Sequence, residues 1–486
     1  MSLEKYFNKF RKNIVGIDKT FTSPYGEKKI IYTDWTASGR LYRPIEEKLL
    51  NEFGPFVANT HTETSVTGSV MTKAYHKARQ IIKDHVNANE DDILIAQGSG
   101  MTGVVNKFQR ILGLRISDNL KPYTNVPDEI KPIVFITHME HHSNQTSWLE
   151  TIADVEIIPY TDSGLVCLDS FEKLLGKYKD RKVKIASITA CSNVTGIQPE
   201  VFKIAEITHK HNGLCFVDFA CSAPYVDINM HKDDKSYFDA IFFSPHKFLG
   251  GPATSGVLIF NKNLYHNTTP DNPGGGTVSW TNPWGEHSYI NDIEVREDGG
   301  TPAFLQTIKI ALAINLKDEM GVENIQNREH EINKIVFEKL NNVNNIHLLA
   351  SQHLDRLGVF SFYIDNLHFN LGVKILNDRF GIQTRGGCSC AGTYGHFLLH
   401  VDKNKSHELV DLIADGCLID KPGWIRMSIH PTITDKEITF VCNSIIALAD
   451  NYKEWSKDYH YDEKSNEFKH INDNNIEDAI IADWFN

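Results

Sequence analysis

Cysteine, positive charge and long apolar runs are all scarce in this chain. Only 8 of its 486 residues are cysteines, and several lie inside apolar stretches, which excludes a disulfide scaffold and predicts reduced thiols. The formal net charge of -12 argues against a nucleic-acid binder or a polybasic protein of membrane surfaces. No apolar run approaches the roughly 18 residues of a membrane span. We therefore expect a cytoplasmic protein that acts on a small molecule.

Internal repeats and low-complexity tracts are also missing, and with 41% hydrophobic residues the chain can bury a large core. Between about residues 92 and 260, short apolar runs alternate with helical patterns. The expected strands read "DILIA", "PIVFIT", "KIASIT", "LCFVDF", "AIFFS" and "GVLIF". Continuous apolar runs separated by helices are typical of a sheet that is covered on both faces. The pattern predicts an α/β domain with a mostly parallel sheet.

The C-terminal part of the chain has a different pattern. A helical stretch from Leu305 to about Leu340 breaks near Gly321, and mixed strand and helix patterns follow it. Thr434 and Glu437 have the spacing of a capping box at the start of the last long helix. We expect four parts: an N-terminal segment 1–30, a large domain 31–320, a small α+β domain 321–455 and an acidic surface tail 456–486.

Polar and glycine residues follow the expected strands, at the sheet edge where open α/β folds bind ligands. "GSGMTG", with Gly100, Met101 and Thr102, opens a helix and offers free backbone N–H groups to a phosphate. His141 follows the next strand. Two further strands are followed by Asp218 and by "SPHKFLGG". Taken singly, each of these residues has an ordinary structural explanation.

Taken together, these groups match the needs of pyridoxal phosphate. That cofactor requires a lysine for covalent attachment, a carboxylate for its pyridine nitrogen, phosphate donors and an aromatic surface over its ring. Lys247, Asp218, the glycine loop and His141 provide one group of each kind.

At this point the chain resembles the class V aminotransferase and cysteine desulfurase group of fold-type I pyridoxal-phosphate enzymes. The resemblance runs from "YTDWTASG" near Tyr32 to "RMSIHPTIT". The motifs in register between them are "GSGMTG", "EHHSN", "SNVTG", "VDFACS", "SPHKFLGGP", "GGGT", "GGTP" and "RGGCSCA". The family implies a large sheet domain with a smaller C-terminal α+β domain.

The resemblance also implies a role for each matching residue. Lys247 would bind the cofactor and act as the catalytic base, Asp218 would pair with the pyridine nitrogen, and His141 would stack on the ring. The residues implied at the cofactor phosphate are Gly100, Met101, Thr102, Ser244 and His246. Thr301 would reach in from a second subunit, which implies a homodimer with shared active sites. Cys221 stands where the family usually has a glutamine that contacts the cofactor oxygen.

The substrate side of the resemblance rests on Asn193, Ala37 and the octapeptide "RGGCSCAG". Asn193 would lie near both the cofactor's phenolic oxygen and the substrate carboxylate, and Ala37 would also contact the substrate. In group II cysteine desulfurases and selenocysteine lyases, the octapeptide matches a loop that holds an arginine and a sulfur-accepting cysteine. Arg385 and Cys390 fall on those two positions.

Three further features bear on this match. Arg426 resembles a second arginine near the substrate. Cys388 and Ser389 replace the two histidines of the group II loop. An arginine followed by C-x-C also resembles the aminotransferase-like domain of molybdenum-cofactor sulfurases. The stretch Thr393–Gly423 is longer than its group II equivalent and carries His396 and His400.

Several interpretations of the octapeptide and of the function stay open. The two cysteines could be buried structural thiols or a redox pair; a metal site is not expected, because no second cysteine pair is present. The leading hypothesis is an enzyme that removes sulfur or selenium from cysteine-type amino acids, leaving alanine and a persulfide for an acceptor protein. The alternatives are an aminotransferase, epimerase or other lyase in which Cys390 is incidental, and a scaffold or sulfur-relay protein without turnover.

Overall fold

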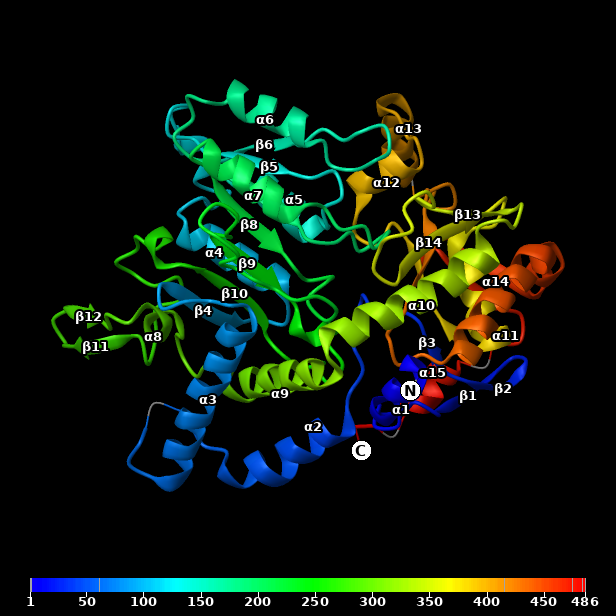
Figure 1. Ribbon diagram of the computed structural model, residues 1–486, viewed down its shortest axis with the longest axis horizontal. Helices are drawn as coiled ribbons and strands as arrows, with labels where there is room; N and C mark the ends of the chain where they lie inside the picture. Colours follow the sequence, from blue (N-terminus) through cyan, green and yellow to red (C-terminus); the bar gives the residue numbers. More distant parts are fainter. Residues whose placement is uncertain (1, 61, 415, 474, 483, 486) are drawn as a thin grey trace. The chain divides into compact units, whose positions relative to one another are not determined.

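The computed structural model describes residues 2–60, 62–414, 416–473, 475–482 and 484–485 (Figure 1). The chain divides into two compact units. The larger unit consists of Ser38–Ser192 and Gln198–Val322, and the smaller unit of Met1–Ala37, Asn193–Ile197 and Glu323–Asn486. Among the described residues, no helix has both the length and the apolar character to cross a membrane.

The larger unit is built on a seven-stranded sheet with the strand order β4-β10-β9-β8-β7-β5-β6 (Figure 1). Its strands are β4 (Asp92–Gln97), β5 (Ile133–Ile136), β6 (Asp154–Ile157), β7 (Lys184–Thr189), β8 (Leu214–Asp218), β9 (Ala240–Phe243) and β10 (Gly256–Asn261). Strands β5 to β9 pair in parallel, and β10 pairs antiparallel with both β9 and β4. The predicted mostly parallel α/β sheet is confirmed.

Helices cover both faces of this sheet. The larger unit contains α2 (Arg43–Lys48), α3 (Val66–His85), α4 (Met101–Ile111), α5 (His142–Leu149), α6 (Leu168–Lys177), α7 (Val201–Lys210), α8 (Ile293–Glu297) and α9 (Phe304–Met320), and a hairpin of β11 (Val278–Thr281) and β12 (His287–Tyr289). Phe108 of α4 packs on Phe216 of β8, whereas Phe135 of β5 packs on Phe171 of α6. Neighbouring residues of β5 face opposite helix layers, which explains why the strand is apolar throughout.

The sequence analysis missed strand β6. Its residues, "DVEI", alternate polar and apolar side chains and are only partly buried. β6 lies at the edge of the sheet, where one side of the strand faces solvent. A short, half-polar edge strand lacks the continuous apolar run that marked its neighbours.

The smaller unit contains a four-stranded sheet of order β13-β14-β17-β16. Its strands, including short pairs, are β1 (Thr20–Ser23), β2 (Gly26–Lys29), β3 (Ile31–Tyr32), β13 (Ile346–Leu348), β14 (Val359–Ile364), β15 (Ile382–Gln383), β16 (Arg385–Gly387), β17 (Trp424–Ser428), β18 (Tyr459–Asp462) and β19 (Glu467–His470). Its helices are α1 (Leu3–Arg11), α10 (Val322–Leu340), α11 (Phe369–Phe380), α12 (Gly392–Leu398), α13 (Lys403–Ala414), α14 (Asp435–Trp455) and α15 (Ile476–Ile481).

Helices α10, α11 and α14 pack their apolar faces on this sheet, with Ile375, Ile425 and Ile445 in one buried cluster. The expected capping box is present, because the Thr434 side chain accepts from the backbone N–H of Glu437 while Glu437 reaches back. The expected break near Gly321 is also present, since α9 ends at Met320 and Gly321 has a φ of 76°.

The division into units differs from the four expected parts at both ends of the chain. The first 37 residues group with the C-terminal unit, because β3 pairs in parallel with β15. Part of the expected surface tail is also integrated: Tyr459 and His470 are buried, and the Tyr25 hydroxyl donates to Asp458 at 2.8 Å. The tail's polar composition hid these few buried aromatic residues.

Candidate functional site

The candidate residues of the larger unit gather at one edge of its sheet. β10 runs antiparallel to both β4 and β9, so β4 points the same way as the parallel strands. The carboxyl ends of β4, β5, β7, β8 and β9 therefore meet at one edge, as expected from the sequence. Asp218, at the end of β8, lies opposite Thr189 of β7 and Phe242 of β9.

Helix α4 begins at this edge with an uncapped N-terminus. Gly100 precedes the helix and makes no side-chain cap, and the Met101 backbone N–H donates to Ser244 Oγ at 2.9 Å. The buried His246 Nε2 has no hydrogen-bond partner within the described chain. Burial and the charge of Lys247 lower the pKa of His246 to about 4, so its ring is neutral at pH 7. Backbone N–H groups, a hydroxyl and an unused ring nitrogen suit a phosphate group.

His141 and Thr102 are joined through one serine. His141 caps α5, with Nδ1 accepting from the Ser143 backbone N–H at 3.1 Å and lying 3.1 Å from Ser143 Oγ. Ser143 Oγ also lies 2.6 Å from Thr102 Oγ1. These bonds fix the orientation of the imidazole at the sheet edge. The sequence analysis missed Ser143, whose hydroxyl connects His141 with Thr102.

Asp218 is a fully buried carboxylate. Its Oδ1 accepts from the Ala220 backbone N–H at 2.7 Å. Burial raises the pKa of Asp218 to about 6, against the lowering effects of this hydrogen bond and of the Lys247 charge. A buried carboxyl group that loses so much hydration is stabilised by a cationic ring nitrogen. Asp218 and Lys247 both belong to the larger unit, and they lie near enough for the charge of Lys247 to lower the pKa of Asp218.

Glu140 is a second buried carboxyl group that sequence reasoning passed over. Its Oε1 accepts from the Thr137 hydroxyl at 2.7 Å and from the Thr189 backbone N–H at 2.8 Å, and its Oε2 accepts from Asn144 Nδ2 at 2.8 Å. Burial raises the pKa of Glu140 to about 8. Glu140 thereby ties the loop that carries His141 to the end of β7.

Cys221 occupies the position where the resemblance expects a glutamine. Its buried thiol donates weakly to the Ser192 carbonyl, with a sulfur-to-oxygen distance of 3.8 Å. A thiol hydrogen bond is weaker than an amide one. Cys221 therefore provides less polar contact here than a glutamine amide would.

Two arginines and one carboxylate form the central cluster of the smaller unit. Arg385 of β16 lies directly opposite Arg426 of β17 in the sheet. Asp34 lies between them: Arg385 Nε and Nη2 reach Asp34 Oδ2 at 3.0 and 2.9 Å, and Arg426 Nη2 reaches Asp34 Oδ1 at 2.7 Å. The side chain of Arg385 is 48% exposed, whereas that of Arg426 is 3% exposed. One arginine can thus meet an incoming anion while the other stays buried.

The sequence analysis missed Asp34. A short bridge pairs Asp34 with Ser428, two residues after Arg426, and brings residues 33–36 alongside β17. Burial lowers the pKa of Arg385. The nearby Asp34, Tyr32 and Cys390 raise it by a larger amount, so the net shift of the pKa is upward. No local pattern around "YTDW" indicates a partner some 350 residues away.

Asn193 and the octapeptide loop also meet in this unit. Asn193 Nδ2 donates to the Ser389 carbonyl at 2.7 Å, and the Asn193 carbonyl accepts from Arg426 Nη1 at 3.1 Å. Asn193 Oδ1 is buried without a hydrogen-bond partner in the described chain. Cys390 is exposed and Cys388 half-buried. The interpretation of the two cysteines as buried structural thiols is therefore wrong for Cys390.

Of the remaining residues, Ala37 lies beside the arginine cluster and His396 lies on the stretch after the octapeptide. Ala37 is half-buried, and its backbone N–H donates to the Asp34 carbonyl at 3.0 Å. His396 bridges the long stretch after the octapeptide, with Nε2 2.8 Å from Ser406 Oγ. Within the described part of the chain, no group of three or more potential metal ligands occurs.

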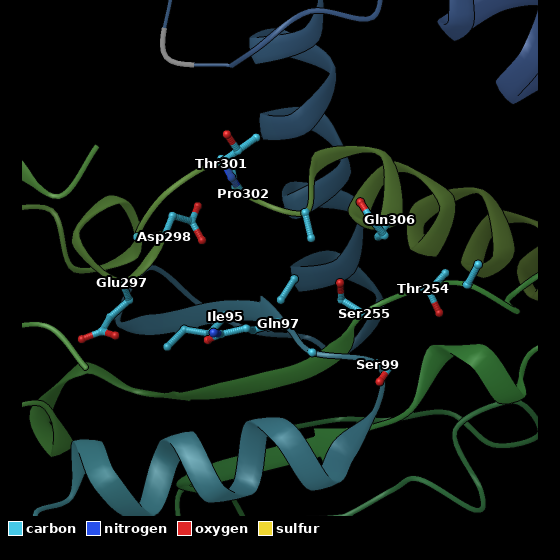
Figure 2. A pocket seen from close by; sticks show the side chains of 15 residues that line it. Ile95, Gln97, Ser99, Thr254, Ser255, Glu297, Asp298, Thr301, Pro302 and Gln306 are labelled. Carbon is cyan, nitrogen blue, oxygen red and sulfur yellow. The ribbon is translucent and has the colours of Figure 1, made fainter. Parts of the chain in front are cut away.

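Thr301 lines a cavity of about 310 Å³ in the larger unit. Figure 2 shows Thr301 and Asp298 on the loop before α9, across the cavity from Gln97 and Ser99 at the end of β4. Asp298 is engaged by Arg79 at 3.0 Å. Gly98 and Ser99 also line the cavity, so it adjoins the glycine loop that precedes α4. Thr301 and this loop belong to the same unit.

Comparison with known proteins adds the following findings. The family model described as Aminotransferase class-V matches residues 31–441. A probable cysteine desulfurase of Halalkalibacterium halodurans is 28% identical over 367 residues, which cover 74% of this chain and 84% of that protein. A probable cysteine desulfurase of Staphylococcus epidermidis is 28% identical over 370 residues, covering 75% and 84%.

Solved structures show the same fold at lower identity. A cysteine desulfurase from Thermococcus onnurineus NA1, solved in its apo form, superposes with a TM-score of 0.71 at 22% identity, covering 91% of this chain and 98% of that one. A cysteine desulfurase from Escherichia coli has a TM-score of 0.69 at 19% identity, covering 92% and 98%.

Proposed function

Because this chain belongs to the class-V aminotransferase family, we propose that it is a pyridoxal-phosphate-dependent enzyme that removes sulfur or selenium from L-cysteine-type amino acids. The observation that carries the proposal is the exposed thiol of Cys390 on the loop that follows β16, the strand that begins with Arg385. A carboxylate-binding guanidinium and an accessible sulfur nucleophile within six residues suit a sulfur-bearing amino acid. The relatives named as probable cysteine desulfurases support the same substrate class.

The residues of the larger unit fit the expected cofactor. The uncapped start of α4, Ser244 Oγ and the unused His246 Nε2 could hold its phosphate, and Asp218 could pair with its ring nitrogen. Lys247 would attach it, and His141 would cover its ring. When bound, pyridoxal phosphate supplies an electron sink for a carbanion at the substrate α-carbon.

The chain's own groups would then divide the reaction. Arg385 would hold the substrate carboxylate, and the buried Arg426 would keep Asp34 in place beside it. The Lys247 amine would accept the α-proton and return a proton to the product. Cys390 Sγ would attack the substrate sulfur, so that a sulfur–sulfur bond forms as the carbon–sulfur bond breaks. In sum, L-cysteine and the Cys390 thiol become L-alanine and the Cys390 persulfide, with no external oxidant or reductant. An acceptor protein could afterwards take the persulfide sulfur.

A single-turnover experiment tests this proposal. Cofactor-loaded protein is mixed with L-cysteine, and alanine and the intact-protein mass are measured. We expect one alanine and a mass gain of one sulfur atom per active site. Cys390→Ala should lose the mass gain and nearly all alanine formation, because the sulfur has no acceptor.

The control is Cys417→Ala, which removes another partly exposed cysteine of the same unit. This variant should behave like the unmodified protein. Full alanine production by Cys390→Ala would contradict the proposed role of Cys390.

A second candidate is an aminotransferase or other lyase of the same family. The observation that favours it is Cys221, whose thiol faces the Ser192 carbonyl where a glutamine amide is expected. Transamination would produce a keto acid from the amino-acid substrate and leave Cys390 unmodified. Assaying keto acid in the same mixtures separates the two activities.

We also propose that the enzyme is a homodimer. Thr301 is exposed on a loop beside a cavity that adjoins the glycine loop, which suits a residue shared with a second copy. Sedimentation equilibrium should give twice the chain mass of 55.1 kDa. A monomer that retains the bound cofactor would contradict this part of the proposal.

A further inference from the structure

The loop from Cys388 to Ala391 has an alternating arrangement of side chains. Ser389 and Ala391 point into the smaller unit and are buried, whereas Cys390 is exposed and Cys388 half-buried. Ser389 and Cys390 have φ values of 52° and 58°, both in the left-handed region. Two consecutive non-glycine residues in that region are strained, and such strain persists only when surrounding contacts hold it.

Two buried side chains supply contacts of this kind. Asn193 Nδ2 donates to the Ser389 carbonyl at 2.7 Å, and Trp424 Nε1 donates to Ser389 Oγ at 3.2 Å. Both donors are themselves fixed. Trp424 is fully buried in β17, and the Asn193 carbonyl accepts from Arg426 Nη1 at 3.1 Å.

Within the loop, the Ala391 backbone N–H donates to the Cys388 carbonyl at 3.0 Å, and side chains from other segments hold Ser389. The backbone and the side chain of Ser389 are each bonded, while its neighbour Cys390 carries the exposed thiol. Because consecutive residues share a peptide plane, holding Ser389 also fixes the direction in which Cys390 leaves the surface.

We infer that Ser389 is a positioning residue, and that Asn193, Trp424 and Ser389 form a clasp that holds Cys390 in place before any substrate arrives. This inference rests on the proposed function, since it assigns the clasp to the sulfur-accepting thiol. A preorganised nucleophile reacts without first ordering its loop. The serine that replaces a histidine of the group II loop thus holds the loop through its carbonyl and its hydroxyl, and does not act as an acid or base.

The test compares amide hydrogen exchange of the loop in cofactor-free protein. Ser389→Ala removes the acceptor of the Trp424 bond, and exchange at Cys388 to Ala391 should become about fivefold faster, as expected for one lost hydrogen bond. In the loaded enzyme, the rate of persulfide formation should fall about tenfold while the KM for L-cysteine stays unchanged. A purely structural defect would instead accelerate exchange throughout the unit.

A double-mutant cycle with Trp424→Phe sharpens this test, because the two residues share one hydrogen bond. The double variant should exchange no faster in the loop than either single variant. Ser444→Ala, at a buried serine of α14, is the matched control and should leave loop exchange unchanged. Loop exchange at the unmodified rate in Ser389→Ala, or additive effects in the double variant, would overturn the inference.

The exchange result is independent of catalysis. If Cys390→Ala retains full alanine production while Ser389→Ala still frees the loop, the proposed function fails and the clasp stands. If Cys390→Ala loses activity while loop exchange is unaffected by Ser389→Ala, the clasp fails and the proposed function stands.

Discussion

At the scale of single residues, buried charges dominate both candidate clusters. In the smaller unit, Asp34 neutralises two arginines that face each other across β16 and β17. Without an anion between them, like charges directly opposite in a sheet repel. In the larger unit, Asp218 and Glu140 are both buried, which raises the pKa of each, and the charge of Asp218 raises the pKa of Glu140 further. A bound anion could add to the neutralisation of the two arginines, and a cationic group could stabilise the ionised form of Asp218.

The titration of Asp218 gives a prediction of pH-dependent stability. Burial raises its pKa to about 6 from the ordinary value of 3.8, so between these values the native state binds more protons than the unfolded state. The contribution is fully present below about pH 4 and is lost as the pH rises through about 6. Asp218→Asn should therefore stabilise cofactor-free protein at pH 7.5, by up to about 3 kcal/mol, and change it little at pH 4.

Urea unfolding at the two pH values measures this difference. Asp118→Asn, at an exposed ion pair with Lys121, serves as the control and should have a small effect at both pH values. If the effect of Asp218→Asn on the free energy of unfolding does not depend on pH, burial does not raise the pKa of Asp218.

At the scale of secondary-structure elements, helix ends decide where the candidate residues lie. Helix α11 ends at Gly381, whose φ of 74° and ψ of 12° are left-handed. The Gly381 carbonyl then accepts from the Ile31 backbone N–H at 2.9 Å, which starts the pairing of β15 with β3. The segment that follows β3 contains Asp34. A helix C-cap therefore helps to bring Asp34 to the arginines.

Gly381→Ala should destabilise the protein through two separate effects. A methyl group at this position would lie 2.0 Å from the Lys29 carbonyl oxygen, and the left-handed backbone disfavours any side chain. Gly26→Ala is the matched control, because Gly26 has a φ of 86° but no atom within 4 Å of the added methyl group. We expect a loss of about 1 kcal/mol for the control and at least about 3 kcal/mol for Gly381→Ala, measured by urea unfolding. Equal losses would mean that the Lys29 carbonyl moves away freely.

At the scale of the whole molecule, the smaller unit is assembled from distant parts of the chain. It takes in the first 37 residues, the short segment Asn193–Ile197 and everything from Glu323 onward. The hairpin of β18 and β19 belongs to it through Tyr459, His470 and Asn466, whose carbonyl accepts from Asn370 Nδ2 at 2.6 Å. From 475 on, the described residues are exposed or half-buried.

Two truncations test how much of the C-terminal part stabilises the fold. Removing residues 475–486 should leave the free energy of unfolding unchanged, because the described residues of this segment bury little apolar surface. Removing residues 457–486 should lower it by at least about 2 kcal/mol, since the buried Tyr459 and the Tyr25 to Asp458 bond are lost. Equal stability of the two truncated proteins, measured by thermal unfolding, would contradict this expectation.

The sequence by itself determined much of this protein. Continuous apolar runs identified the main strands of the large sheet, because burial on both faces requires apolar residues at every position. Local signals identified the helix break at Gly321 and the helix cap at Thr434. The residues after each strand, such as Asp218 and Lys247, pointed to one sheet edge because parallel strands end together.

Only the tertiary structure decided the long-range contacts. Asp34 meets Arg385 and Arg426 through a pairing of β3 with β15, which joins segments some 350 residues apart and leaves no local pattern. The bonds that hold Ser389 come from Asn193 and Trp424, and neither residue is adjacent to the loop in sequence. Which thiol is exposed likewise depends on these contacts, since the octapeptide alone allows several backbone conformations. Periodicity and caps are short-range properties of a sequence, whereas the partners of buried polar groups are set by how the whole chain packs.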